Sequence, residues 1–152
     1  MKKLLIIVFA TIAAVWLLGS LSTPGTVAPP ANAAAEQAKL EAFQKAVAAR
    51  VSGSSKWEGI EVNNASGASY SLKLWYRTRP GGQAEVSRDA KAVVQATLDE
   101  LIAQGRQPAQ ERIFVSTHAY QSEKGATGQA LVRVFGRAIY DFNNDSITYK
   151  PE

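Results

Sequence analysis

The chain has 152 residues, a formal net charge of +4 and no cysteine. The lack of cysteine excludes disulfide bonds and thiol chemistry, and it favours a bacterial envelope protein, because small secreted eukaryotic domains are often disulfide-dense. Lys2 and Lys3 contribute part of the positive charge. The remaining excess is too mild to favour a nucleic-acid partner, which needs a clustered basic face.

The N-terminal segment has the organisation of an export signal. Lys2 and Lys3 precede an apolar run, residues 4–21, and the segment that follows ends in Ala31-Asn32-Ala33. A positive start, an apolar stretch and a small-x-small site are the features that secretion machinery recognises. We therefore expect the protein to be exported.

The length of the apolar run leaves both retention and cleavage open. As a helix, its roughly 18 residues would span about 27 Å, just enough for a bilayer core. Cleaved signals have shorter apolar regions, and Pro24, Pro29 and Pro30 separate this run from the small-x-small site. Residues 1–21 are thus either a transmembrane anchor facing the periplasm or a signal peptide. Cleavage near Ala33 would leave a periplasmic or secreted protein.

The next segments predict a linker followed by a single domain. Residues 22–35 are rich in Pro, Ala, Ser and Thr and indicate a linker, and residues 36–152 are enough for one domain with its own core. Apolar residues at helical spacing predict an amphipathic helix over 35–51. A strand is expected over 57–62, and the clear alternation of apolar and polar residues over 70–77 predicts another.

The second half repeats this pattern of a helix followed by strands. A second helix is predicted to start from Ser87 as its N-cap and to end at Gly105. Two strands follow over 112–121 and 129–142, with a bulge or bend expected at Phe135-Gly136. A turn in the segment 143–145 can fold the tail back as a short last strand.

The order α-β-β-α-β-β predicts an α+β domain preceded by an N-terminal hydrophobic helix. We expect a two-layer sandwich in which an antiparallel sheet carries both helices on one face. The similar length of the two halves is compatible with a duplicated αββ unit. The poor residue match between them leaves open the alternative of two ordinary hairpins, each preceded by a helix.

Candidate binding residues lie on two of the predicted strands. They are Lys73, Trp75 and Arg77 on one strand face, and Arg133, Phe135 and Arg137 on a face of a later strand. If these faces point outward, the rings offer stacking and the cations offer contacts to an anionic polymer, a lipid headgroup or an acidic protein. The alternative is an ordinary solvated sheet face.

Residues that support catalysis or metal binding are sparse. His118 is the only histidine and can in principle act as a general base on a nearby serine, but no nucleophile motif accompanies it. Asp141 and Asp145 flank Asn143 and Asn144, yet the spacing lacks the glycine and glutamate of a calcium-binding loop and favours a turn. We expect no catalytic residue, metal ion or cofactor.

Three functions remain compatible with the sequence. The leading hypothesis is a small exported or membrane-tethered envelope domain with a non-enzymatic binding or assembly role, with a protein as its partner. It would contact the membrane through residues 4–21 if these are not cleaved. The alternatives are a periplasmic or secreted binder of an anionic ligand through the basic and aromatic sheet face, and a small hydrolase that uses His118. A two-layer α+β fold does not decide among them.

Overall fold

The computed structural model describes residues 31–51, 54–125 and 128–152. The elements are α2 (Ala31–Arg50), β1 (Trp57–Ser66), β2 (Ser69–Tyr76), α3 (Gln83–Ala103), β3 (Phe114–Lys124), β4 (Ala130–Asp141) and β5 (Ser146–Pro151). The predicted hydrophobic segment 1–21 and most of the predicted linker lie outside the described residues. Neither described helix has the length and apolar character that crossing a membrane requires.

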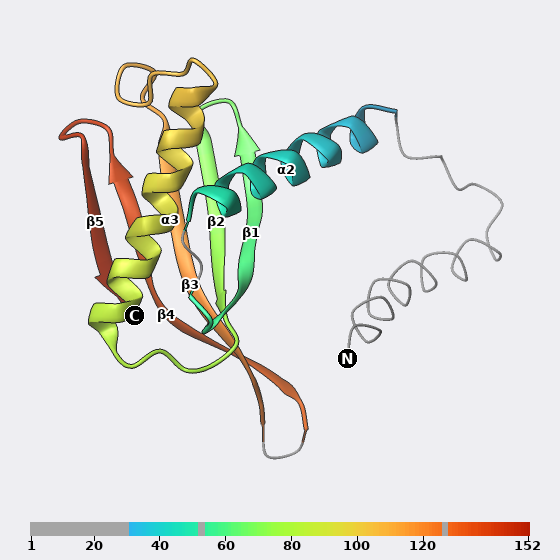
Figure 1. The fold of residues 1–152 in the computed structure, drawn as a ribbon, viewed down its shortest axis with the longest axis vertical. Coiled ribbons are helices and arrows are strands. Elements are labelled where there is room, and N and C mark those ends of the chain that lie inside the picture. Colours follow the sequence, from blue (N-terminus) through green and yellow to red (C-terminus); the bar gives the residue numbers. More distant parts are fainter. Residues whose placement is uncertain (1–30, 52–53, 126–127) are drawn as a thin grey trace, which may run out of the picture. The chain divides into compact units, whose positions relative to one another are not determined.

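The strands form one five-stranded sheet in the order β1-β2-β3-β4-β5 (Figure 1). Three neighbouring pairs are antiparallel, whereas β2 and β3 run parallel. The α+β class with two helices is therefore confirmed, but the prediction of a purely antiparallel sheet is wrong. The predicted order α-β-β-α-β-β is also extended by β5, which is the short last strand expected from the turn before it.

The parallel pair follows from the length of α3. This helix has 21 residues and so rises about 31 Å. Strands of 8 and 11 residues, the lengths of β2 and β3, span about 26 and 36 Å. The helix therefore returns the chain along the sheet to the end where β2 began, and β3 sets out in the same direction.

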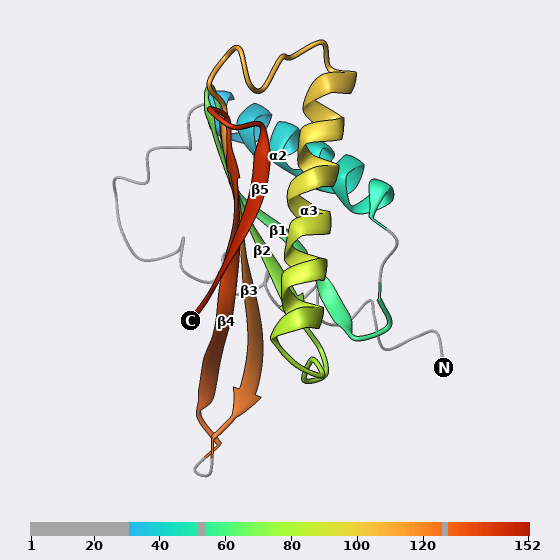
Figure 2. The same ribbon diagram turned by 90° about the vertical axis from the view of Figure 1, so that its left-hand side faces the viewer.

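Both helices lie against one face of the sheet (Figure 2). α3 contacts β3, β4 and β5, while α2 crosses β1 and β2, where the rings of Phe43 and Tyr70 lie 5.3 Å apart. The core fills the space between helices and sheet; its fully buried members include Val47, Leu72, Leu74, Val93, Val94, Leu101 and Val115. Residues 35–152 form one compact unit.

The two ends of α3 can be compared with the residues predicted to start and stop it. At the end of α3, Gly105 has a φ of 80° and Arg106 N–H donates to Leu101 O at 2.9 Å, the pattern of a glycine-terminated helix, so the predicted stop is confirmed. The prediction of Ser87 as the N-cap is wrong, because α3 already begins at Gln83. Glu85 instead reaches back and accepts a hydrogen bond from the Gly81 N–H.

The start of α2 differs from the prediction, whereas the irregularity in β4 agrees with it. α2 begins at Ala31 rather than near residue 35, in keeping with the high helix propensity of its alanine-rich start. In β4 the predicted bulge is confirmed: Gly136 pairs with Ala119 while Val134 pairs with Tyr120, which leaves Phe135 as the extra residue. Gly136 has a φ of 150°, a conformation that favours glycine.

Candidate functional site

The sheet face opposite the helices, called the outer face below, carries a row of rings. Trp75 of β2 lies beside Tyr120 of β3 with 5.2 Å between ring centroids, and His118 continues the row at 6.1 Å from Tyr120. The parallel register pairs Trp75 with Tyr120 and Lys73 with His118, so these side chains share one face. Within the described part of the chain, no helix covers this face (Figure 2).

Glu61 of β1 fixes the Trp75 ring in place. The Trp75 Nε1–H donates to Glu61 Oε2 at 3.0 Å, and the Lys73 ammonium lies 3.1 Å from Glu61 Oε1. Burial opposes ionisation of Glu61, but the hydrogen bonds from Trp75 and Lys73 outweigh it and keep the pKa of this carboxyl below its ordinary value. The indole is therefore oriented by a carboxylate, and the charge of Lys73 is neutralised.

A hollow opens beside the Trp75 ring because its neighbour on β1 has no side chain. Gly59 pairs with Trp75 across β1 and β2, and the hollow has a volume of about 310 Å³. The other residues that line it are Glu58, Ile60, Glu61 and Ser122. A Cβ built on Gly59 would have no atom within 4 Å, so the space is open rather than filled by a neighbour.

Exposed aliphatic side chains extend the outer face along β4. Val134 lies opposite Tyr120 and is 40% exposed, and Val132 lies opposite Ser122 and is 55% exposed. Both valines belong to the described part of the β3–β4 hairpin, which extends beyond β1, β2 and β5 (Figure 1). Contiguous exposed apolar surface of this kind marks interaction sites in soluble domains.

Arg137 supplies a positive charge on this face that no ion pair among the described residues neutralises. It lies opposite His118 on one side and Lys150 on the other, and its buried Nε has no hydrogen-bond partner among the described residues. Burial and the nearby guanidinium of Arg137 lower the pKa of His118, while Glu152 acts in the opposite direction. His118 is therefore neutral at pH 7, and Arg137 remains a cation that can receive a carboxylate.

The structure brings together only part of the predicted basic and aromatic set. Lys73, Trp75 and Arg137 lie on the outer face, whereas Phe135 packs on the helix side, where its ring meets Tyr76 edge-on at 5.8 Å. The geometric prediction that Arg133, Phe135 and Arg137 share a face is wrong, because the bulge breaks the alternation between them.

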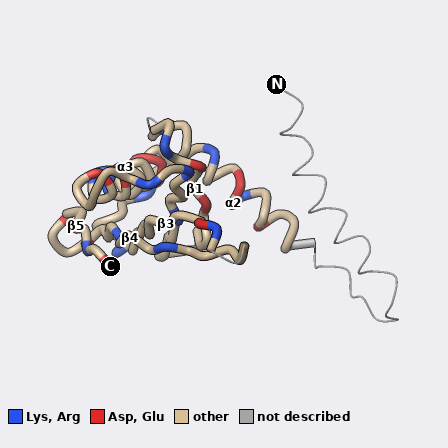
Figure 3. The backbone as a smooth tube through the Cα atoms, turned by 90° about the horizontal axis from the view of Figure 1, so that it is seen from below, with Lys and Arg blue, Asp and Glu red and all other residues tan. Residues whose placement is uncertain are grey.

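The two remaining predicted cations lie away from the row of rings. Arg133 pairs with Glu123 at 3.1 Å on the hairpin, and Arg77 is exposed just beyond the end of β2. Figure 3 shows acidic and basic residues interspersed along the described elements rather than gathered into one basic surface. The outer face is therefore more apolar and less cationic than the sequence pattern indicated.

Sequence reasoning missed Tyr120, Glu61 and Gly59 as parts of this face. The alternation that places Tyr120 on the same side as His118 is visible in the sequence, but its contact with Trp75 depends on the parallel pairing of β2 and β3. Glu61 and Gly59 lie on β1, whose predicted extent covers both residues. Nothing in the sequence indicates that they face Trp75.

The arrangement can bind, but it shows little that could catalyse. The structure shows no hydrogen bond between the His118 ring and a described side chain, and no described cluster of three or more acidic or histidine side chains could hold a metal ion. Asp141 accepts hydrogen bonds from Asn143 and Asn144, which confirms the predicted turn. Comparisons of the chain with models of protein families, with curated proteins and with solved structures find no match.

Proposed function

We propose that this protein is an exported, non-enzymatic binding module of a bacterial cell envelope, and that its outer face contacts a partner protein. The apolar segment 4–21 either anchors it in the inner membrane or is removed near Ala33. The observation that carries the binding role is the open hollow beside Trp75, whose ring Glu61 orients on an uncovered sheet face.

The chemistry of the outer face defines the partner surface that fits it. Rigid aromatic rings beside a hollow are suited to receive an apolar side chain, because they offer contact area with little loss of side-chain entropy. The free guanidinium of Arg137 and the ammonium of Lys150 favour a carboxylate on the partner. The proposed partner therefore presents an apolar side chain next to an acidic residue.

Other predicted functions find less support in the geometry. Binding of an anionic polymer would use Lys73 and Arg133, but both are already paired with glutamates. A hydrolase would need a nucleophile hydrogen-bonded to His118. The contact that the structure gives for the His118 ring is with the ring of Tyr120 instead. These contacts favour a binding role over either alternative.

Crosslinking in the host tests the proposed surface. A photoreactive residue at Val134 on the outer face should give a covalent adduct with one protein, and the same residue at the exposed Lys45 of α2 should not. Gly59→Leu should abolish the adduct at Val134, because the leucine side chain would occupy the hollow, and a Cβ at this position meets no atom within 4 Å. An adduct that persists unchanged in Gly59→Leu would refute the proposed site.

The intact mass of the protein in membrane and soluble envelope fractions tests the location. A full-length chain in the membrane fraction would establish a tethered module. A soluble species that begins at Ala34 would establish a released one. A full-length chain found only in the cytosol would contradict the proposal, because an export signal is its premise.

A further inference from the structure

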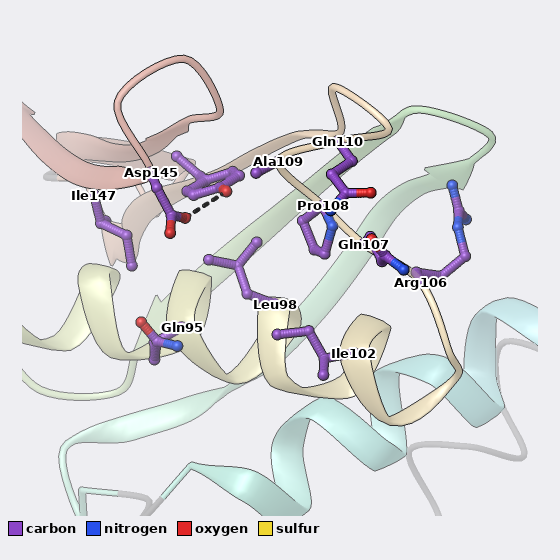
Figure 4. Close-up of a pocket in the computed structure, with 11 residues that line it drawn as sticks. Gln95, Leu98, Ile102, Arg106, Gln107, Pro108, Ala109, Gln110, Asp145 and Ile147 are labelled. Carbon is purple, nitrogen blue, oxygen red and sulfur yellow. Dashed lines mark hydrogen bonds between the residues drawn. The ribbon is translucent and has the colours of Figure 1, made fainter.

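A second hollow lies on the helix side of the molecule, apart from the outer face. It has a volume of about 480 Å³ and lies between the C-terminal half of α3, the segment 106–110 and the β4–β5 turn (Figure 4). Pockets of this size are within the range of small-molecule sites. The segments around it are far apart in the sequence, and none of the six predicted binding residues lines it.

The floor of this pocket is aliphatic. Leu98 and Ile102 of α3 project into it, Ile147 of β5 closes one side, and Pro108 lies opposite (Figure 4). Ile102 is 58% exposed, which is unusual for an isoleucine on a helix that faces the core. An apolar stem lying along this floor would remove these side chains from water.

A single carboxylate stands at the wall of the pocket. Asp145 points into it (Figure 4), and the buried Tyr140 hydroxyl donates to Asp145 Oδ1 at 2.7 Å. Burial, together with the hydrogen bond to Asp145, raises the pKa of Tyr140 to about 12, so this hydroxyl remains a donor at physiological pH. Asp145 Oδ2 is left open, since none of the ion pairs among the described residues involves Asp145.

The one cation that lines the pocket is already engaged elsewhere. Arg106 pairs with Glu111 at 2.6 Å, and its guanidinium also donates to the Tyr70 hydroxyl and to Gly67 O, each at 3.1 Å. Its charge is therefore compensated on the side away from Asp145. The free charge of the pocket is negative and lies above an apolar floor.

We propose that this pocket binds a primary ammonium group carried on an unbranched aliphatic stem. The ammonium pairs with Asp145 Oδ2, and the stem lies along Leu98, Ile102 and Ile147. Two sources carry this chemistry: a free aliphatic amine and the lysine side chain of a peptide. The site is independent of the outer face.

The test is a titration of the full-length chain in non-ionic detergent micelles with n-butylamine, followed by NMR of Leu, Ile and Val methyl groups. Saturable shifts are expected at Leu98, Ile102 and Ile147, with a dissociation constant in the millimolar range, about 1–50 mM, for so small a ligand. n-Butanol at the same pH has the same stem without the charge and should bind at least about fivefold more weakly. Equal binding of the alcohol and the amine would overturn the proposal.

Two variants separate the contribution of the Asp145 charge to amine binding from that of the apolar floor. Asp145→Asn keeps an oxygen for Tyr140 and tolerates the φ of 45° at this position, so it should leave the fold intact and weaken butylamine about fivefold. Ile102→Ser on the exposed helix surface should weaken the amine and the alcohol alike. Undiminished amine binding in either variant, or no methyl shift in the wild type, would refute the site.

Comparison of cadaverine with Nα-acetyl-lysine N-methylamide separates the two sources. Tighter binding of cadaverine would identify a free amine as the ligand class, and tighter binding of the lysine derivative would identify a peptide. If neither compound shifts the methyl groups of Leu98, Ile102 and Ile147, the proposal fails. None of these outcomes depends on the partner surface around Trp75.

Discussion

Removal of the Asp89 carboxylate should destabilise the domain more than any exposed substitution. Asp89 lies in α3 and is only 4% exposed. Its Oδ2 accepts hydrogen bonds from Trp57 Nε1–H of β1 and from the Tyr76 hydroxyl of β2, both at 3.0 Å. Burial and Asp89 raise the pKa of Tyr76 well above its ordinary value, so the hydroxyl stays protonated and donates. One carboxylate thus ties the helix to two strands.

The magnitude follows from the donors that would lose their acceptor. Asp89→Ala leaves the Trp57 and Tyr76 donors without a partner, and a hydrogen bond to a charged group contributes about 1.5–3 kcal/mol. We therefore expect the free energy of unfolding to fall by about 3–5 kcal/mol. Asp89→Asn keeps an oxygen that can accept from both donors, and should cost about 1–2 kcal/mol. Lys45→Ala is the control and should change stability little, because Lys45 is exposed on α2.

Urea denaturation of residues 34–152, followed by tryptophan fluorescence, measures these differences. This fragment is the form that cleavage near Ala33 would leave, and Trp57 and Trp75 report its unfolding. If Asp89→Ala does not fold at all, Asp89→Asn still gives a measurable midpoint, since domain stabilities are about 5–15 kcal/mol. A loss below about 1 kcal/mol in Asp89→Ala would refute the view that its two hydrogen bonds hold the layers together.

Three further predictions concern positions in the sheet. Burial and Arg137 lower the pKa of His118 in the folded state. Below about pH 6.5 the unfolded chain therefore binds more protons than the folded one, and the free energy of unfolding falls with falling pH. His118→Gln should remove this pH dependence from urea midpoints measured across the range. Thr117 Oγ1 is buried without a partner, so Thr117→Val should leave the free energy of unfolding unchanged or raise it by up to about 1 kcal/mol, and a clear loss in urea titration would contradict this. Gly136→Ala should cost about 2–4 kcal/mol, because its Cβ would meet the Tyr149 ring, and wild-type stability in urea would argue against the bulge geometry.

The sequence was sufficient to predict features that depend on one residue or on a regular alternation of residues. Gly105 ends α3 and the bulge lies at Phe135-Gly136, because glycine permits backbone angles that other residues rarely adopt. The alternation over residues 70–77 gave β2 and its buried side correctly, since Leu72 and Leu74 face the core. The N-cap of α3 was missed because a glutamate inside the helix, Glu85, replaces the expected side chain at its start.

The prediction that Arg133, Phe135 and Arg137 share a strand face was wrong because it conflicted with the bulge predicted in the same strand. A bulge at Phe135-Gly136 shifts the strand by one residue, and such a shift moves the following side chains to the other face. The sequence argument nevertheless placed Arg133, Phe135 and Arg137 on one face, as a regular strand would. Applying the bulge to the alternation would have placed Phe135 with the core and left Arg137 outside, as the structure shows.

The contact between Trp75 and Tyr120 could not be predicted because it depends on the path of the whole chain. The two rings belong to β2 and β3, which α3 joins, and only a helix long enough to return the chain along the sheet makes these strands parallel neighbours. Asp89 holds that same helix to Tyr76, the residue next to Trp75. The stability of the core and the geometry of the outer face are therefore linked through one short stretch of β2, and loss of the Asp89 contacts should disturb the Trp75 site before the sheet itself unfolds.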